Sequence, residues 1–213
     1  MSRFRDDEPV RREHAQVAQL PTSASLAMPE WFASVAAALP DAVDDVDGRM
    51  TLIHELAMRN VTERSGGPFA AGVFERDSGR IVALGVNRVV ATHSSCAHAE
   101  FMALTLAQCA LGTWNLGAAH LPAHQLVVNW RPCAMCFGSV LWSGIVDLVL
   151  AGEGEEVERL TGFDEGPIHP DWRAELERRG VHLTVGIGHE QAIVTFEAYR
   201  DSGAPVYNSG PVV

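Results

Sequence analysis

Two short segments carry the residues best suited to bind a metal ion. They are CAHAE (96–100) and PCAMC (132–136). The imidazole of His98 and the thiolates of Cys133 and Cys136 can form a tetrahedral zinc site with one position left open. An open position is typical of catalytic zinc, because it admits a water molecule whose pKa falls to roughly 7. Glu100 follows His98 closely enough to reach that water without binding the metal.

Both segments are expected to begin helices, over residues 98–110 and 133–141. Pro132 suits a first helical position, because its missing N–H would have no intrahelical partner there. Cys133 and Cys136 then lie one turn apart on the same face. The amino end of a helix also lowers the pKa of a thiol, which favours both thiolates.

Apolar periodicity and turn residues predict the elements that must position these side chains. Helices are expected at 29–39, 49–63, 98–110, 133–141, 172–179 and 189–199, and strands at 69–75, 80–90, 125–129, 146–151 and 181–185. A turn at 77–79 makes the first two strands antiparallel. This order of elements predicts an α/β fold with a mixed sheet covered by helices on both faces.

The length and composition favour one domain. The chain has 213 residues, of which 47% are hydrophobic, enough for one sizeable core. Residues 1–27 are polar and without clear periodicity, so we expect a flexible or loosely docked extension, followed by a single domain over 28–213. Without a long apolar run or an apolar leader segment, no membrane association is expected, and the expected location is the cytoplasm.

The charge and the cysteines narrow the class of partner. The formal net charge is -11, with only 16 Lys and Arg residues. Binding a phosphate backbone normally requires many basic residues, so a small heterocyclic substrate is favoured over nucleic acid. A disulfide framework is not expected in a chain of this kind. Cys96 and Cys109 are therefore interpreted as ordinary packing residues.

Three other readings of the metal motif stay open at this stage. A lone C-x-x-C pair can be redox active, although such a pair needs no H-x-E upstream. A structural zinc site would need a fourth ligand, and His93 and Cys96 are the nearby candidates. A non-catalytic zinc domain used for dimerisation would leave Glu100 dispensable.

The complete pattern H-x-E…P-C-x-x-C is typical of zinc-dependent nucleobase deaminases. At these residues the chain resembles the cytidine-deaminase-like superfamily. Within that superfamily it is most similar to bacterial guanine deaminases, including members that act on s-triazines such as ammeline. The resemblance rests on GGPFAAGVFERDSG (66–79), GVNRV (85–89), AHAEFMAL (97–104), PCAMCFGSVLWSG (132–144), GFDEGP (162–167) and VYNS (206–209).

The resemblance implies a three-layer α/β/α sandwich with a five-stranded mixed sheet. It also implies a bound Zn²⁺ ion and a homodimer whose C-terminal segments exchange between subunits. Glu100 and Glu165 would be the catalytic carboxylates. The substrate-binding residues would be Phe69, Asn87, the backbone of Ala99, Trp142 and Tyr207.

Arg131 departs from the family pattern, because many guanine deaminases and related tRNA enzymes have Glu at this position. Arginine offers five donors and no acceptor. In the pocket it would favour an acceptor-rich ring, such as a cytosine-like base, 5-azacytosine or an s-triazine. Arg131 could equally point to solvent or pair with an acid such as Glu165. The bulky neighbour Trp130 could narrow the pocket or pack outside the sheet.

The expected function is therefore zinc-dependent hydrolytic deamination of a free nucleobase or a related small amino-heterocycle. Glu100 would move protons from water to the ring nitrogen and the leaving amine, and ammonia would depart. A tRNA or polynucleotide deaminase is the main alternative, although the acidic composition disfavours it.

Overall fold

The computed structural model of the protein describes residues 20–208. Most of the extension predicted over residues 1–27 and the last residue of the VYNS motif therefore lie outside the described residues. Residues 20–27 form no helix or strand and are largely exposed. The division of the chain at residue 27 stays a prediction.

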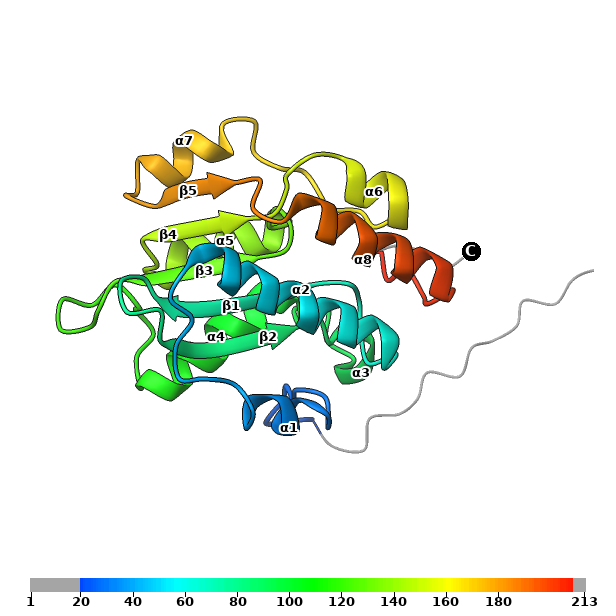
Figure 1. Cartoon of the computed structure of the whole chain (residues 1–213), viewed down its shortest axis with the longest axis horizontal. Coiled ribbons are helices and arrows are strands. Elements are labelled where there is room, and N and C mark those ends of the chain that lie inside the picture. Colours follow the sequence, from blue (N-terminus) through cyan, green and yellow to red (C-terminus); the bar gives the residue numbers. More distant parts are fainter. Residues whose placement is uncertain (1–19, 209–213) are drawn as a thin grey trace, which may run out of the picture.

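A single five-stranded mixed sheet forms the centre of the molecule (Figure 1). Its strands are β1 (Ala70–Glu75), β2 (Ile81–Val86), β3 (His124–Val128), β4 (Asp147–Leu150) and β5 (His182–Val185), in the order β2-β1-β3-β4-β5. Strand β1 pairs antiparallel with β2 and β3, whereas β3, β4 and β5 are parallel. The predicted mixed sheet and the antiparallel first pair are thus confirmed.

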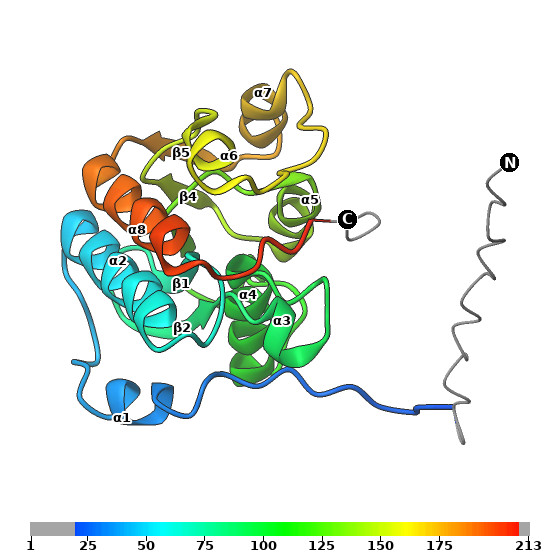
Figure 2. The same cartoon turned by 90° about the vertical axis from the view of Figure 1, so that its right-hand side faces the viewer.

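Helices cover both faces of this sheet. They are α1 (Phe32–Ala36), α2 (Val46–Thr62), α3 (Val89–Thr92), α4 (Ala99–Leu111), α5 (Ala134–Ser143), α6 (Glu156–Thr161), α7 (Trp172–Glu177) and α8 (His189–Ser202). Figure 2 shows α2 and α8 side by side on one face, with α4 and α5 on the other. The predicted α/β/α layering is confirmed. Among the described residues, no helix is long and apolar enough to cross a membrane.

The central strands are apolar on both sides because both faces are covered. Along β3, Val127 packs into the core beneath α2 and α8, while Leu126 and Val128 pack into the core beneath α4 and α5. Each of these side chains is buried. Helices α4 and α5 therefore pack closely against a buried sheet, which fixes their positions.

Three predictions about the elements were wrong in detail. The second strand was predicted to reach residue 90, but it ends at Val86, and α3 begins at Val89. The side chain of Asn87 accepts a hydrogen bond from the Val89 N–H, which turns the chain out of the sheet. Helix α1 is shorter than the predicted 29–39. Helix α6 was not predicted, because only two of its residues are buried and its apolar period is weak.

Candidate active site

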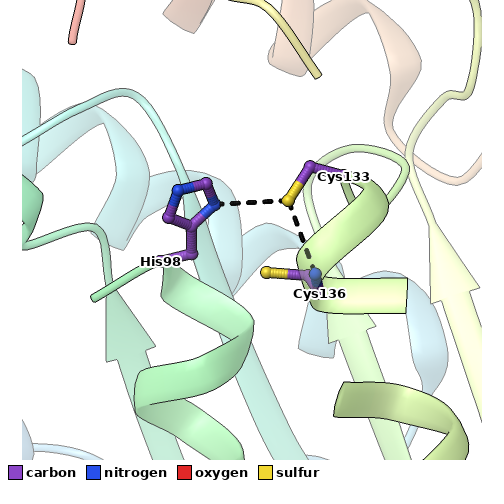
Figure 3. A group of neighbouring side chains, drawn as sticks. All are labelled: His98, Cys133 and Cys136. Atoms are coloured by element: carbon purple, nitrogen blue, oxygen red, sulfur yellow. Dashed lines mark hydrogen bonds between the residues drawn. The ribbon is translucent and has the colours of Figure 1, made fainter. Parts of the chain in front are cut away.

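The three predicted metal ligands come together at the amino ends of α4 and α5. The ligand atoms of His98, Cys133 and Cys136 all lie within 4.8 Å of one another. Figure 3 shows the His98 ring facing the Cys133 sulfur, with Cys136 one turn further along the helix. The His98 Nδ1 atom lies 3.5 Å from the Cys133 Sγ atom. Residues far apart in the sequence thus form one compact donor set.

Helix capping places two of these ligands. His98 is the N-cap of α4 and Cys133 is the N-cap of α5, both with extended backbone angles. The Cys136 N–H donates to the Cys133 Sγ atom over 3.4 Å. Cys133 thereby takes the role that a polar side chain usually plays at this position. Pro132 does not occupy the first helical position. It precedes the N-cap Cys133, and Ala134 is the first residue of α5.

The thiols and the imidazole strongly perturb one another. A hydrogen bond from the Cys136 thiol, and then one from His98, lowers the pKa of the Cys133 thiol to about 4. The same hydrogen bond, together with burial, raises the pKa of the Cys136 thiol well above its ordinary value. Burial opposes protonation of His98, but the contact with Cys133 outweighs it and raises the His98 pKa. One thiolate is therefore present before any cation arrives.

These donors fit zinc. Two thiolates and one imidazole are ligands that zinc accepts in a tetrahedral site. Both cysteines are buried, and neither forms a disulfide. Within residues 20–208, the group contains these three ligands and no fourth. His93 and Cys96, the candidates for a closed structural site, do not belong to it.

Glu100 lies in the first turn of α4, next to the metal-binding group. Its side chain is only 6% exposed. Burial raises the pKa of the Glu100 carboxyl to about 7, and the Cys133 thiolate adds to the rise. A carboxyl group with such a pKa can both accept and return protons near neutral pH.

A cavity of about 250 Å³ opens beside the ligands. It is lined by Phe69, Val89, Ser95, His98, Cys133, Ala134, Met135, Phe163, Asp164, Glu165, Gly166, Tyr207 and Asn208. Of the residues proposed from the sequence, Phe69, Glu165 and Tyr207 line this cavity together with two of the metal ligands. The volume suits a small heterocycle.

Glu165 brings a second carboxyl group to the cavity. Burial raises the pKa of Glu165 to about 8, and the nearby Cys133 and Glu100 add to the rise. The Glu165 carbonyl accepts a hydrogen bond from the Ala134 N–H over 3.0 Å. This bond ties the loop that carries Glu165 to the first residue of α5, directly after the ligand Cys133.

Aromatic rings form one wall of the cavity. The centroid of the Phe163 ring lies 5.5 Å from that of Phe69 and 4.6 Å from that of Tyr207. The Tyr207 ring is edge-on to His98 at 6.5 Å. The Tyr207 hydroxyl is buried without a hydrogen-bond partner among the described residues. Within this single chain, the tail after α8 therefore covers the chain's own site.

Asn87 and Ala99 flank the cavity without being part of its lining. Asn87 is 1% exposed, and its Oδ1 atom accepts from the Gly67 and Val89 amides. Its Nδ2 atom has no partner within the described part of the chain, which leaves a donor available. Ala99 is fully buried as the first residue of α4, where helical N–H groups have no partner inside the helix.

Arg131, Trp130 and Trp142 do not line the cavity. The Arg131 guanidinium lies 3.4 Å from a Glu158 carboxylate oxygen on α6. Trp130 is 1% exposed and packs edge-on against Phe196 of α8, so it does not narrow the pocket. Trp142 is 83% exposed on α5. The structure thus brings none of the three to the substrate space within one chain.

Several lining residues were not identified from the sequence. Phe163, Asp164 and Asn208 lie in two of the six segments quoted for the resemblance, and that was the available signal. Val89 ends another of these segments and was predicted to lie in a strand, whereas Ser95 lies outside all six. Nothing in their residue types marks them as parts of a site.

A mixed sheet that seats a His and two Cys ligands at two helix ends, with a buried Glu beside them, defines a zinc-binding deaminase. Residues 45–152 match the family model described as the cytidine and deoxycytidylate deaminase zinc-binding region. The protein belongs to this family.

Among its relatives are bacterial guanine deaminases. The structure of guanine deaminase from Nitrosomonas europaea is 42% identical in sequence, covers 86% of this chain and 99% of that chain, and gives a TM-score of 0.80. Another solved structure, a complex with 2,6-diaminopurine, is 43% identical over 85% of this chain and 95% of that chain, with a TM-score of 0.79. Guanine deaminase from Bacillus subtilis is 32% identical over 68% of this chain and 88% of its own length.

Proposed function

We propose that this protein hydrolyses guanine, replacing the ring amino group by an oxo group and releasing ammonia. The observation that carries the proposal is a small cavity lined by Glu165 and by the ligands His98 and Cys133, with Glu100 buried beside the metal-binding group. The similarity to two guanine deaminases along most of the chain supports guanine as the ring.

His98, Cys133 and Cys136 would hold a zinc ion, which would act as a Lewis acid that makes water acidic enough to ionise near neutral pH. The chain itself contributes the carboxyl group of Glu100, which lies beside the metal-binding group and can both accept and donate protons. Glu100 accepts one proton from the attacking water and delivers it to the ring nitrogen, then accepts the remaining proton from the new C–OH group and delivers it to the departing amine. Water oxygen replaces the amino nitrogen, and ammonia carries the nitrogen away.

Glu165 faces the cavity as a second proton carrier and a substrate ligand. With a pKa of about 8, it holds a proton at neutral pH and can donate a hydrogen bond to a ring nitrogen or carbonyl. Phe69 and Phe163 offer flat apolar contacts to the heterocycle. Asn87 Nδ2 is a further buried donor, without a hydrogen-bond partner among the described residues.

The ring preference depends on which donors and acceptors reach the cavity. An acceptor-rich ring such as ammeline, cytosine or 5-azacytosine was expected if Arg131 faced the substrate. The Arg131 guanidinium instead pairs with Glu158, which removes the physical reason for that preference. We therefore propose guanine before the s-triazines and cytosine-like rings as the substrate.

A substrate panel tests this proposal. The zinc-loaded protein is incubated with guanine, ammeline, cytosine, 5-azacytosine, adenine and guanosine, and ammonia is measured. We expect the highest kcat/KM for guanine. A higher kcat/KM for ammeline or cytosine would contradict guanine as the preferred substrate and would support a pocket that prefers acceptor-rich rings. Release from no free ring would contradict the proposed function altogether.

A variant of Arg131, measured on the same substrates, tests whether this side chain contacts the substrate. Arg131→Gln removes the guanidinium and keeps a long polar side chain. If Arg131 does not meet the substrate, the order of the substrates stays as in the unchanged protein. A selective loss of activity on triazines would show that Arg131 reaches the ring.

A further inference from the structure

The loop that carries Glu165 is a short, well-defined turn. It runs from Gly162 to Gly166, and these two glycines have φ angles of +80° and +73°. Other residues rarely adopt such angles, so both ends of the loop depend on glycine. The Asp164 side chain accepts a hydrogen bond from the Gly166 N–H over 2.8 Å, which closes the turn around Glu165.

Two contacts from elsewhere in the chain fix this turn in space. One is the bond from the Ala134 N–H to the Glu165 carbonyl. The other is made by the side chain of Asn208, near the C-terminus. Its Oδ1 atom accepts from the Asp164 N–H, and its Nδ2 atom donates to the Gly162 carbonyl, each over 2.8 Å.

The Asn208 contact has the character of a clamp. One amide group satisfies a donor and an acceptor on the two sides of Phe163, as a neighbouring strand would. Phe163 is 4% exposed and packs against Tyr207, the residue before Asn208. Two adjacent tail residues thus hold the loop, one through hydrogen bonds and one through an aromatic contact.

The tail itself is anchored. The Tyr199 hydroxyl on α8 donates to the Pro205 carbonyl over 2.7 Å. The path from α8 through Pro205 to Asn208 is short, so the position of the clamp follows that of α8. Since the Glu165 loop connects α6 with α7, the clamp links two separate parts of the fold across the cavity mouth.

We infer that Asn208 is a positioning residue for the reaction: its amide clamps the backbone at Gly162 and Asp164 and thereby holds Glu165 over the substrate. This inference rests on the proposed function, in which Glu165 serves the reaction. The alternative role for Asn208 is direct substrate contact, because Asn208 also lines the cavity.

A double-mutant cycle separates these roles. Asn208→Ala removes both hydrogen bonds, and Asn208→Leu removes them while keeping the branched arrangement of side-chain heavy atoms. In the otherwise unchanged protein, we expect either variant to lower kcat about 10- to 100-fold with little change in KM. In a Glu165→Gln background, measured under single-turnover conditions, the same substitution should cost less than about twofold, because the two effects are not additive.

The outcome of the cycle is decisive. Equal losses in both backgrounds would overturn the inference, and a loss confined to KM would assign Asn208 to substrate binding instead. Val206→Ala is the matched control, because Val206 lies in the same tail but is 43% exposed and outside the cavity lining. We expect this control to keep its activity.

A second measurement does not depend on turnover. Amide hydrogen exchange of the zinc-loaded full chain reports on the loop at 162–166. We expect faster exchange at Asp164 and its neighbours in Asn208→Ala than in Val206→Ala. Unchanged exchange would show that the clamp does not hold the loop. If the unchanged protein releases ammonia from no ring, the proposed function fails and the positioning role falls with it, while the exchange result still tests the clamp.

Discussion

Cys133 and Cys136 lie one helical turn apart, yet the pKa values of their thiols are shifted in opposite directions. The pKa of Cys133 falls to about 4, whereas that of Cys136 rises well above its ordinary value. The cause is their shared hydrogen bond, which stabilises a single negative charge on the pair. A second thiolate forms only when a cation compensates it, so metal binding and proton release are coupled.

This coupling predicts how zinc affinity depends on pH. In the metal-free protein, Cys136 keeps its proton at neutral pH and the raised pKa of His98 favours its imidazolium form. Both groups must lose protons to bind the metal, so affinity increases as pH rises from 6 to 8, by about tenfold per unit for each proton released. Competition with a chromogenic chelator at several pH values measures this zinc affinity. A zinc affinity that does not change with pH would contradict the assignment of Cys136 and His98 as ligands that release protons. Cys109→Ser, which replaces an exposed cysteine, is the control and should keep the same dependence on pH.

Individual residues were predictable where chemistry demands fixed types at fixed spacing. His98, Glu100, Cys133 and Cys136 satisfy that demand and were identified from the sequence alone. Arg131 was not predictable, because the direction of a long side chain depends on its neighbours. Its partner Glu158 lies on α6, a helix that the sequence did not reveal.

At the scale of elements, the seat of α4 on the sheet determines where His98 and Glu100 lie. Strand β2 approaches this helix closely at Gly85. A Cβ atom on Gly85 would lie 2.4 Å from the Ala99 carbonyl oxygen and 2.5 Å from the Ala103 nitrogen. Both are backbone atoms, so the helix could accommodate a side chain only by moving away from the sheet.

We therefore expect Gly85→Ala to lower the free energy of unfolding by about 1–3 kcal/mol. The displaced helix should also lower the rate of ammonia release, since misplacing a catalytic group by about 1 Å can cost about 100-fold. Denaturant unfolding and the ammonia assay measure the two effects.

Gly138→Ala is the matched control for this experiment. Gly138 lies inside α5, and a Cβ atom there meets nothing within 4 Å. Alanine favours a helix over glycine, so this variant should gain up to about 1 kcal/mol. Equal stability of the Gly85 and Gly138 variants would contradict the proposed close contact.

The five strands and the helices at the metal-binding motifs were predicted well, whereas α3 and α6 were not. Strands β1, β3 and β4 each contain a run of apolar residues, and α4 and α5 begin at the metal-binding motifs. Helices α3 and α6 have four and six residues and few buried side chains. Helices this short show no clear apolar period. The bond from the Val89 amide to Asn87 is a local turn signal before α3, and the strand predicted over 80–90 overlooked it.

At the scale of the whole molecule, the net charge favours a small substrate over a polynucleotide. A tRNA or polynucleotide deaminase is the main alternative that the sequence left open. The chain carries a formal net charge of -11. Phosphate contacts require basic side chains, so this excess of acidic groups disfavours RNA as a partner.

We therefore expect no retention of tRNA by the zinc-loaded protein in a filter-binding assay at low salt. A phosphate-binding surface would instead give binding that weakens steeply as salt increases. Such salt-dependent retention, followed by inosine formation in the bound tRNA, would contradict the small-substrate assignment.

The association state is a second property of the whole molecule. A homodimer with exchanged C-terminal segments stays a prediction from family resemblance. Light scattering would give a mass of twice 23.0 kDa for such a dimer. The single-chain mass would show that the tail covers its own site, as it does in the chain described above.

The most direct test of the account is ammonia release from guanine by the zinc-loaded protein, compared with its Glu100→Gln variant and with chelator-treated protein. Glu100→Gln keeps the shape of the side chain but cannot accept a proton, so we expect a loss of about 100- to 10,000-fold in kcat with the zinc content unchanged. Chelation should abolish release, and added zinc should restore it. Full activity of Glu100→Gln with zinc bound would contradict the assignment of Glu100 as the proton carrier and the catalytic reading of the site.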